Sequence, residues 1–360
     1  MKTKFIIIGY GWRTNFYYRI TKLLPNEFEI TACVLRTEER AQEITQQEGF
    51  FATSSLQLAL ETKPDFAVLC VPRNVTTSYL TTLMKHNIPV LCETPPAQNI
   101  EELNILWANT LALNGKIQVA EQYQFQPFYA SISRLIQNGY LGEVSSAMLS
   151  AVHGYHAISL FRNYLDAAFE NCTIQGQQFH FPLIETHNRA GLLTTGKPIT
   201  STRDWATIQF NSGKVAFLDF MGEQYFSEIR TRRWNIQGTR GELNDSIMRY
   251  LNPENFPITQ ELFRIDVGRN NIDEWSHRGY QFLDQMLYTN PYFPARLNDD
   301  EIAIATCLSR MKQYVETGTT FYPLAEALQD AYLSFVLEEA LRTGTSITTS
   351  TQTWAPEQNT

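Results

Sequence analysis

Residues 4–14, which read KFIIIGYGWRT, have the types and spacing that could bind a phosphate. An apolar segment, Phe5 to Ile8, leads directly into Gly9-x-Gly11, and a segment of helical pattern follows. A strand, a glycine turn and a helix in this order bring backbone N–H groups and the positive end of a helix dipole to one point. The run therefore predicts a pyrophosphate site, although a strand–helix turn without a ligand has the same outline.

The run Val152-His153-Gly154-Tyr155-His156 contains side chains that could carry a proton. An imidazole titrates near neutral pH, so His156 is a candidate general acid or base, and a buried histidine with satisfied hydrogen bonds is the alternative. If the run is extended, His153 and Tyr155 share one face and His156 points the other way. Arg73 and Arg162 could each hold an anionic substrate group or form an ion pair on the surface, and we favour the surface role for Arg162.

The first third of the chain alternates short apolar segments with helical ones, which indicates an α/β fold with a doubly wound parallel sheet over residues 1–122. A sheet of this kind binds its ligand at the carboxyl ends of its strands. The expected strands are Phe5–Ile8, Glu29–Leu35, Asp65–Val71, Pro89–Cys92 and Ile117–Ala120, and the expected helices are Arg13–Leu24, Glu38–Glu48, Val75–His86 and Ile100–Leu113.

From residue 123 the pattern changes, and residues 123–345 are expected to form a second α/β domain with a large mixed, mainly antiparallel sheet. Residues 346–360 are rich in threonine, and we expect a flexible tail. The expected strands are Trp205–Phe210, its hairpin partner Val215–Phe220, and Ile229–Gln237, and the expected helices are Pro127–Gln137, Asp299–Glu316 and Pro323–Arg342.

Composition excludes several classes of protein. The formal net charge of −8 argues against a nucleic-acid or anionic-membrane partner, because those need a basic surface. No apolar run approaches the roughly 18 residues of a membrane span, and the apolar segment at the start is too short for a signal peptide. The five cysteines have no pairing or metal-ligand spacing, so we expect reduced thiols, no metal site and a cytoplasmic protein.

Several motifs in order give the chain a resemblance to a known family, the glucose–fructose oxidoreductase/inositol dehydrogenase/MocA (Gfo/Idh/MocA) family. The resemblance covers about residues 4 to 345. It implies an N-terminal Rossmann domain, NAD(P)-dependent oxidation or reduction of a sugar, polyol or related small molecule, and a homo-oligomer (dimer or tetramer) formed through the C-terminal sheet. The motifs are the glycine turn, Val71-Pro72, Cys92-Glu93-Thr94-Pro95, Gly139-Tyr140-Leu141-Gly142-Glu143, Gly154-Tyr155-His156, Gly238-Thr239-Arg240-Gly241 and the closing helix before Gly344.

The second strand predicts the choice of cofactor. An acidic residue near its end would bind the ribose 2′-hydroxyl of NAD, but Leu35 stands there, followed by Arg36 and Thr37. A guanidinium and a hydroxyl suit a 2′-phosphate, so NADP is expected and NAD is possible; Arg36 stacked on adenine or in solvent is the alternative. The predicted cofactor-binding residues are Gly9, Gly11, Trp12, Arg13, Arg36, Thr37, Val71, Pro72, Glu93 and Pro95.

The chain departs from the family at two positions that the resemblance links to catalysis. Thr94 stands where the family has lysine, and Val152 stands where it has aspartate, so His156 is the remaining catalytic candidate. Three readings stay open: an oxidoreductase with His156 as proton carrier, a dinucleotide-binding sensor without catalysis, and a reductase resembling biliverdin reductase that draws its proton from tyrosine or water. The predicted substrate-binding residues are Thr94, Tyr123, His153 and Tyr155.

Overall fold

The structure is a computed structural model that describes residues 2–268 and 275–356. Its contacts divide the chain into two compact units. The first takes in the described parts of 1–130, 265–279 and 289–328, and the second those of 131–264, 280–288 and 329–360. The chain thus returns to the first unit after the second has begun. The predicted domain boundaries at residues 122 and 345 do not include this return. Those two boundaries remain predictions.

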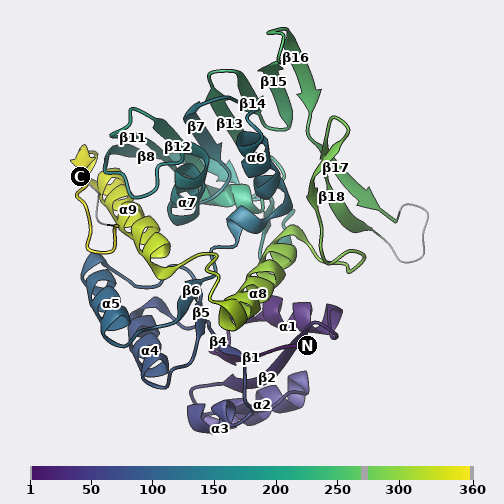
Figure 1. Cartoon of the computed structure of the whole chain (residues 1–360), viewed down its shortest axis with the longest axis vertical. Coiled ribbons are helices and arrows are strands. Elements are labelled where there is room, and N and C mark those ends of the chain that lie inside the picture. The colour runs from purple at the N-terminus through teal and green to yellow at the C-terminus, as the bar shows by residue number, and fades with distance from the viewer. Residues whose placement is uncertain (1, 269–274, 357–360) are drawn as a thin grey trace. The chain divides into compact units, whose positions relative to one another are not determined.

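A six-stranded parallel sheet forms the centre of the first unit, in the order β3-β2-β1-β4-β5-β6 (Figure 1). The predicted apolar strands are buried on both faces: Ile6, Ile7 and Ile8 are at most 1% exposed. The strands are β1 (Thr3–Ile8), β2 (Phe28–Val34), β3 (Ala52–Thr53), β4 (Phe66–Leu69), β5 (Val90–Cys92) and β6 (Ile117–Val119).

Helices connect these strands, and several of them begin at side-chain caps. Thr37, Ser55 and Asn99 each accept a hydrogen bond from the backbone N–H three residues later, which satisfies a donor that the first helical turn leaves open. The helices are α1 (Thr14–Leu23), α2 (Glu38–Glu48), α3 (Leu56–Leu60), α4 (Arg73–Lys85), α5 (Ile100–Ala112) and α8 (Asp299–Thr317), and a 3-10 turn, η1 (Tyr123–Phe125), follows β6. Helix α8, far along the chain, packs on α1 and is tied to the sheet by an ion pair from Lys312 to Asp65 (2.8 Å).

The second unit is built on a nine-stranded sheet in the order β16-β15-β14-β13-β7-β12-β11-β8-β20. Only the β7–β12 pair is parallel, so the sheet is mixed and mainly antiparallel, which confirms the predicted fold class. Its strands are β7 (Val144–Ser150), β8 (Cys172–Ile184), β11 (Pro198–Phe210), β12 (Val215–Met221), β13 (Arg233–Gly238), β14 (Gly241–Asn244), β15 (Ile247–Leu251), β16 (Pro257–Glu261) and β20 (Ile347–Thr348).

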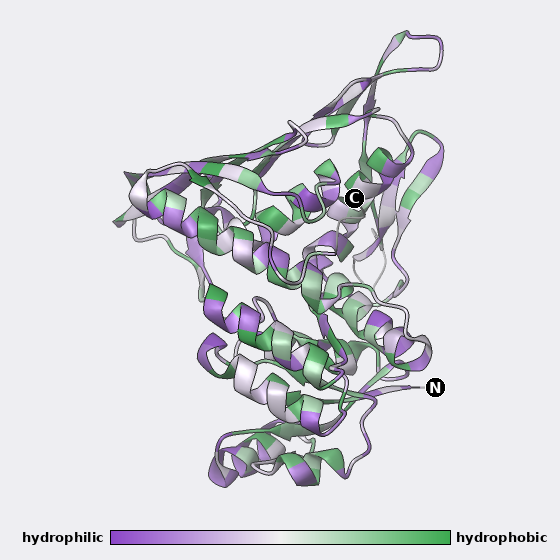
Figure 2. Cartoon of the chain, turned by 60° about the vertical axis from the view of Figure 1, so that its left-hand side comes forward, coloured by the Kyte–Doolittle hydropathy of each residue, from purple (hydrophilic) through white to green (hydrophobic). Residues whose placement is uncertain are grey.

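Shorter elements and three helices complete the fold. A three-stranded sheet has the order β17-β18-β19, and β9 pairs with β10. The bounds are β9 (His187–Asn188), β10 (Gly191–Leu192), β17 (Phe263–Val267), β18 (Ser276–Phe282), β19 (Gln285–Thr289), the 3-10 turn η2 (Gly222–Tyr225), α6 (Pro127–Gln137), α7 (Gly154–Leu165) and α9 (Leu324–Thr343). Figure 2 shows that the long helices mix hydrophobic and hydrophilic residues, as expected of helices that cover a sheet with one side.

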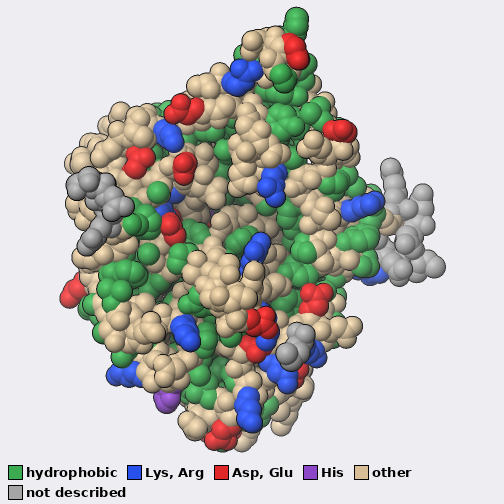
Figure 3. Space-filling view, viewed as in Figure 1, with side chains coloured by type: hydrophobic (Ala, Val, Ile, Leu, Met, Phe, Trp, Pro, Cys, Tyr) green, Lys and Arg blue, Asp and Glu red, His purple; other side chains and the backbone are tan. Residues whose placement is uncertain are grey.

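The two faces of the nine-stranded sheet differ. Helix α9 covers one face closely, because a Cβ at Gly176 of β8 would lie 2.9 Å from Leu341 of α9. Side chains alternate along a strand, so the opposite face, which we call the outer face, carries Phe179, Phe181 and Trp205, exposed at 39%, 45% and 50%. On the side of the molecule drawn in Figure 3, acidic and basic side chains are interspersed.

Two sequence-based expectations are wrong in detail. The strand predicted from Ile229 begins at Arg233. The expected flexible tail is ordered over residues 346–356, because β20 pairs with β8 and the Trp354 side chain is 3% exposed and donates to Gln329 Oε1 (3.0 Å). The threonine-rich composition gave no sign of this strand, since a two-residue strand at the edge of a sheet depends on its partner rather than on its own pattern.

Candidate active site

The glycine turn after β1 has the geometry that its residues predict. Gly9 adopts φ +106°, and a Cβ there would lie 2.2 Å from the Cys70 carbonyl oxygen, so only glycine fits. A Cβ at Gly11 would meet no described atom within 4 Å, which leaves the backbone open to a ligand. Thr14, at the third position of the glycine pattern, accepts the Gly11 N–H (2.9 Å) and donates to the Gly11 carbonyl (2.5 Å). A bound phosphate would compete with this threonine for the Gly11 N–H.

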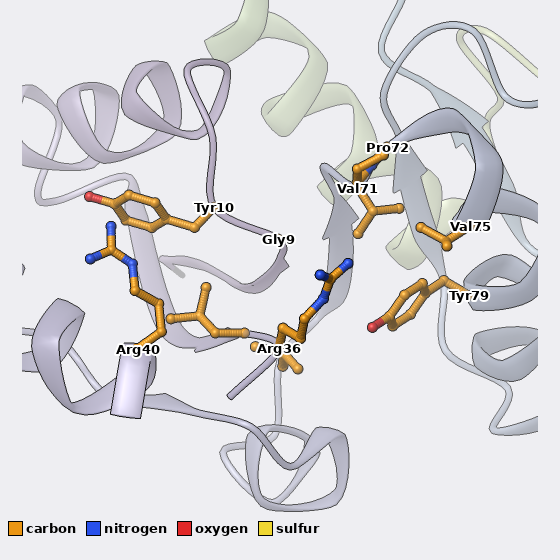
Figure 4. Close-up of a pocket in the computed structure, with 10 residues that line it drawn as sticks. Gly9, Tyr10, Arg36, Arg40, Val71, Pro72, Val75 and Tyr79 are labelled. Carbon is orange, nitrogen blue, oxygen red and sulfur yellow. The ribbon is translucent and has the colours of Figure 1, made fainter. Parts of the chain in front are cut away.

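A cavity of about 420 Å³ opens at the carboxyl ends of β1, β2 and β4. In Figure 4, Tyr10 and Arg40 lie on one side, Val75 and Tyr79 on the opposite side, and the Arg36 side chain rises between them. The lining residues are Gly9, Tyr10, Val34, Leu35, Arg36, Arg40, Val71, Pro72, Val75 and Tyr79. Gly9, Arg36, Val71 and Pro72, which the sequence assigned to one cofactor, are therefore together in one cavity.

The charge of this cavity is basic. Its lining contains two arginines and no carboxylate. Among residues 2–268 and 275–356, no carboxylate pairs with the exposed Arg36 guanidinium, whereas Arg40 pairs with Glu43 (2.5 Å) and lies 5.2 Å from the centre of the Tyr10 ring. Thr37 caps α2 through its hydroxyl. Sequence reasoning missed Arg40; its spacing, four residues after Arg36 at the start of a helix, was the available signal.

Arg13 and Glu93 form the centre of a second cluster in the first unit. Arg13 Nε lies 3.3 Å from a Glu93 carboxylate oxygen, and the Tyr17 hydroxyl donates to the other oxygen (2.6 Å). Burial acts to lower the pKa of Arg13, but Glu93, Tyr17 and other nearby acidic groups together outweigh it, so that pKa is raised. Burial and then Glu93 raise the pKa of Tyr17. With its amide nitrogen donating to the Ala120 carbonyl, Gln122 also accepts from Arg13 Nη2 (3.0 Å).

This cluster joins the start of α1 to the ends of β5 and β6. Arg13 and Tyr17 are four residues apart, so they lie on one face of the helix start and can reach the same carboxylate. The sequence analysis assigned Arg13 to the cofactor and missed Tyr17. Trp12, next to Arg13, is half exposed and packs edge-on against Phe16 with ring centres 4.9 Å apart.

The remaining predicted residues of the first unit follow the ends of β4, β5 and β6. Thr94 is half-buried, and the peptide bond from Thr94 to the buried Pro95 is cis. Tyr123 lies in η1 with its ring packed edge-on against Tyr129, 5.8 Å between centres. Arg73 begins α4 and is exposed.

In the second unit, the histidine run begins a helix rather than continuing a strand. Because α7 starts at Gly154, His153 and His156 are three residues apart on a helical path, and their ring centres are 4.5 Å apart. His153 is exposed, whereas His156 is 5% exposed and Tyr155 4% exposed. The alternation that an extended run would give is therefore wrong. Val152 is fully buried, so it belongs to the core.

Tyr225 and Arg162 complete the surroundings of this helix. The His153 backbone N–H donates to the Tyr225 hydroxyl (3.0 Å). Arg162 is buried and donates to Asp330 (2.6 Å) and to the Ala168 carbonyl (2.6 Å). The expectation of a surface arginine at position 162 is therefore wrong: a buried ion pair links α7 to α9.

Comparison with known proteins supports the predicted resemblance for the N-terminal part of the chain. Residues 3–122 match the model of GFO_IDH_MocA, described as an oxidoreductase family with an NAD-binding Rossmann fold. Residues 3–122 are therefore similar to the NAD-binding domain of this oxidoreductase family, and the match confirms the predicted resemblance over these residues. The "Putative oxidoreductase YteT" of Bacillus subtilis (strain 168) is 24% identical over 156 residues, which is 42% of this chain and 35% of that protein. The chain thus matches about a third of the length of that curated relative.

Solved structures extend the likeness of fold to nearly the whole chain. An oxidoreductase from Agrobacterium radiobacter in complex with NAD+, L-tartaric acid and magnesium gives a TM-score of 0.68 at 14% identity, covering 96% of this chain and 98% of that one. Levoglucosan dehydrogenase in complex with NADH gives 0.68 at 14% (98% and 100%), and a myo-inositol dehydrogenase from Corynebacterium glutamicum ATCC 13032 gives 0.65 at 14% (97% and 99%). At this identity the comparison establishes the two-part fold alone.

The described residues contain no helix long and apolar enough to cross a membrane. Within the same ranges, no three His, Cys, Asp or Glu side chains come together as a metal site.

Proposed function

We propose that this protein is a nicotinamide-dependent oxidoreductase that prefers NADP(H) and acts on a small polar carbonyl or hydroxyl compound, such as a sugar or a polyol. The observation that carries the proposal is the cavity at the glycine turn, with Arg36 inside it and no carboxylate in its lining. The family of residues 3–122 supports NAD(P) as the ligand. The neighbours named above as dehydrogenases support the substrate class.

The preference for NADP(H) rests on charge. Leu35, at the end of the second strand, is buried and offers no acceptor for a ribose 2′-hydroxyl. Arg36 follows it, exposed and without an ion-pair partner among the residues that the structure describes. A guanidinium group binds a phosphate well, so we expect Arg36 to favour NADP(H), which carries the 2′-phosphate, over NAD(H), which does not.

A bound nicotinamide would supply or accept the hydride, which leaves the protein to orient the substrate and to move one proton. We assign the proton to His156. Since His156 is nearly buried and its ring lies against the exposed His153, His153 would exchange the proton with solvent. Thr94, where the family has lysine, retains a hydroxyl that can hydrogen-bond a substrate but cannot titrate near neutral pH.

The proposal is tested by screening the purified protein for NADPH oxidation with pools of sugars, inososes and keto acids. His156→Ala should lower kcat by about 10²–10⁴-fold, and His153→Ala by less, because water can replace an exposed relay. If His156→Ala leaves turnover unchanged, the assignment of His156 as proton carrier is wrong, but the proposal that the protein is an oxidoreductase still stands. Tight NADPH binding without turnover on any pool favours the sensor, for which Thr94 and the buried Val152 are the supporting observation.

We also propose a cytoplasmic homo-oligomer that pairs through the outer face of the nine-stranded sheet. The exposed Phe179, Phe181 and Trp205 support this interface, since contiguous exposed aromatic residues are typical of subunit contacts. All five cysteines are free thiols, which supports a reducing compartment. Trp205→Glu should lower the mass measured in solution by light scattering, and an unchanged oligomer contradicts this interface.

A further inference from the structure

A basic run precedes and opens β13. Residues 230–233 read Arg-Thr-Arg-Arg in a chain whose net charge is −8. Arg233, the first residue of the strand, shares Asp219 with Arg203: Arg233 Nη2 lies 2.8 Å from one carboxylate oxygen, and Arg203 Nε lies 2.5 Å from the other. A single carboxylate therefore serves two guanidinium groups on the outer face of the sheet.

The hydrogen bonds of the other two arginines go to backbone carbonyl groups. Arg232 Nη2 donates to the Tyr225 carbonyl (3.4 Å), and Arg230 Nη1 donates to the carbonyl of Ile229 (2.9 Å). In the ranges 2–268 and 275–356, no carboxylate lies within ion-pair distance of either side chain. Both are exposed, and no carboxylate among the described residues neutralises either charge.

The acidic residues nearest to this run in the sequence are engaged elsewhere. Glu223 accepts a hydrogen bond of 2.5 Å from the Ser201 hydroxyl. Glu228 pairs with the imidazole of His187 at 3.7 Å. Three carboxylates (Glu223, Glu228 and Asp219) thus stand against the four arginines at 203, 230, 232 and 233. Their formal charges leave an excess of positive charge.

Arg232 contacts Tyr225, the tyrosine that adjoins the histidine pair. Its guanidinium carbon lies 5.7 Å from the centre of the Tyr225 ring, a cation–π distance that fixes the group without removing its charge. Tyr225 in turn contacts His153, with ring centres 6.3 Å apart and a hydrogen bond from the His153 N–H to its hydroxyl. A chain of pairwise contacts in the second unit therefore links Arg232 through Tyr225 to His153 and His156.

We propose that Arg232 binds an anionic group of the substrate, so that the substrate is a carboxylated or phosphorylated hydroxyl or carbonyl compound rather than a neutral sugar. This inference rests on the proposed function, because it names the substrate class of the same histidine site. Arg162, the other arginine near this site in sequence, is occupied by the buried Asp330 and is not available for this role. A planar guanidinium binds carboxylate and phosphate with two parallel hydrogen bonds, which a neutral sugar cannot match.

The test compares Arg232→Gln and Arg232→Lys with the wild type and with Arg249→Gln, an exposed arginine of β15 in the same sheet. NADPH oxidation is measured with sugar acids, sugar phosphates and neutral sugars of matched carbon number. Arg232→Gln should raise KM for the anionic substrates by about ten- to a hundredfold, and Arg232→Lys by less. It should leave KM for neutral sugars unchanged, and Arg249→Gln should alter neither. Comparing the sugar acids with the sugar phosphates shows whether the site binds a carboxylate or a phosphate.

Equal KM values for Arg232→Gln and wild type on anionic substrates overturn the inference, as does a wild type that prefers neutral sugars. Binding of inorganic phosphate and of tartrate is measured in parallel by calorimetry. If no compound is turned over, the proposed function fails, and the binding measurement still decides the inference. Anion binding that Arg232→Gln weakens and Arg249→Gln does not supports it, whereas no binding to the wild type, or equal binding by wild type and Arg232→Gln, refutes it.

Discussion

Replacing Arg36 by glutamine should change the choice between the two nicotinamide cofactors. The guanidinium is the cationic group of the cavity without a carboxylate partner in the described chain, so its interaction with a 2′-phosphate is not shared. A hydrogen bond to a charged group contributes about 1.5–3 kcal/mol, and about 1.4 kcal/mol corresponds to a tenfold change in affinity. Because Arg36 is exposed and screened by solvent, we expect the lower end, about a tenfold rise in KM for NADPH.

The assay is steady-state kinetics with NADPH and NADH on one substrate. Arg36→Gln should raise KM for NADPH and leave KM for NADH within about twofold. Arg40→Gln is the matched control: Arg40 lines the same cavity but already pairs with Glu43, so its effect should be smaller. Leu35→Asp should favour NADH, because it places a carboxylate where a 2′-hydroxyl would bind. A wild type that prefers NADH, or an Arg36→Gln variant that weakens both cofactors equally, refutes the reasoning.

Three further predictions concern the other clusters. Asp330→Asn should lower the free energy of unfolding by about 3–5 kcal/mol in a denaturant titration, because it removes a carboxylate charge from beside the buried Arg162 guanidinium. The double variant Arg162→Met/Asp330→Leu should recover stability, and no recovery would contradict the buried-charge explanation. Glu93→Gln should raise KM for the cofactor more than Tyr17→Phe does, because the Glu93 change weakens contacts to both Arg13 and Tyr17. Equal effects of the two variants would contradict the shared role of Glu93. Burial raises the pKa of the Cys33 thiol from 9.0 to about 11, so between these pH values the folded state keeps a proton that the unfolded state loses. Stability should therefore fall as pH rises from about 9 to about 11. Cys33→Ser should flatten that slope, and an unchanged slope would contradict the role of Cys33.

Much of the first unit could be predicted from the sequence because its signals are local. A strand buried on both faces must be apolar along its length, and a turn that brings Gly9 within 2.2 Å of the Cys70 carbonyl must be glycine. The second unit gave weaker signals. Strands that are apolar on one face only alternate with period two, and short edge strands such as β20 have almost no pattern of their own.

The sequence by itself determined the order of strands and helices, the glycine turn and the presence of Arg36 after the second strand, because each depends on neighbouring residues. Only the tertiary structure decided which distant side chains meet. Asp330 lies 168 residues from Arg162 and Glu93 lies 76 residues from Tyr17, yet each pair is within hydrogen-bonding distance. Tyr225 likewise lies 72 residues from His153 and joins it to Arg232. Such pairings depend on strand register and helix packing, which no local pattern encodes, and they determine which charges are neutralised and which can bind a ligand.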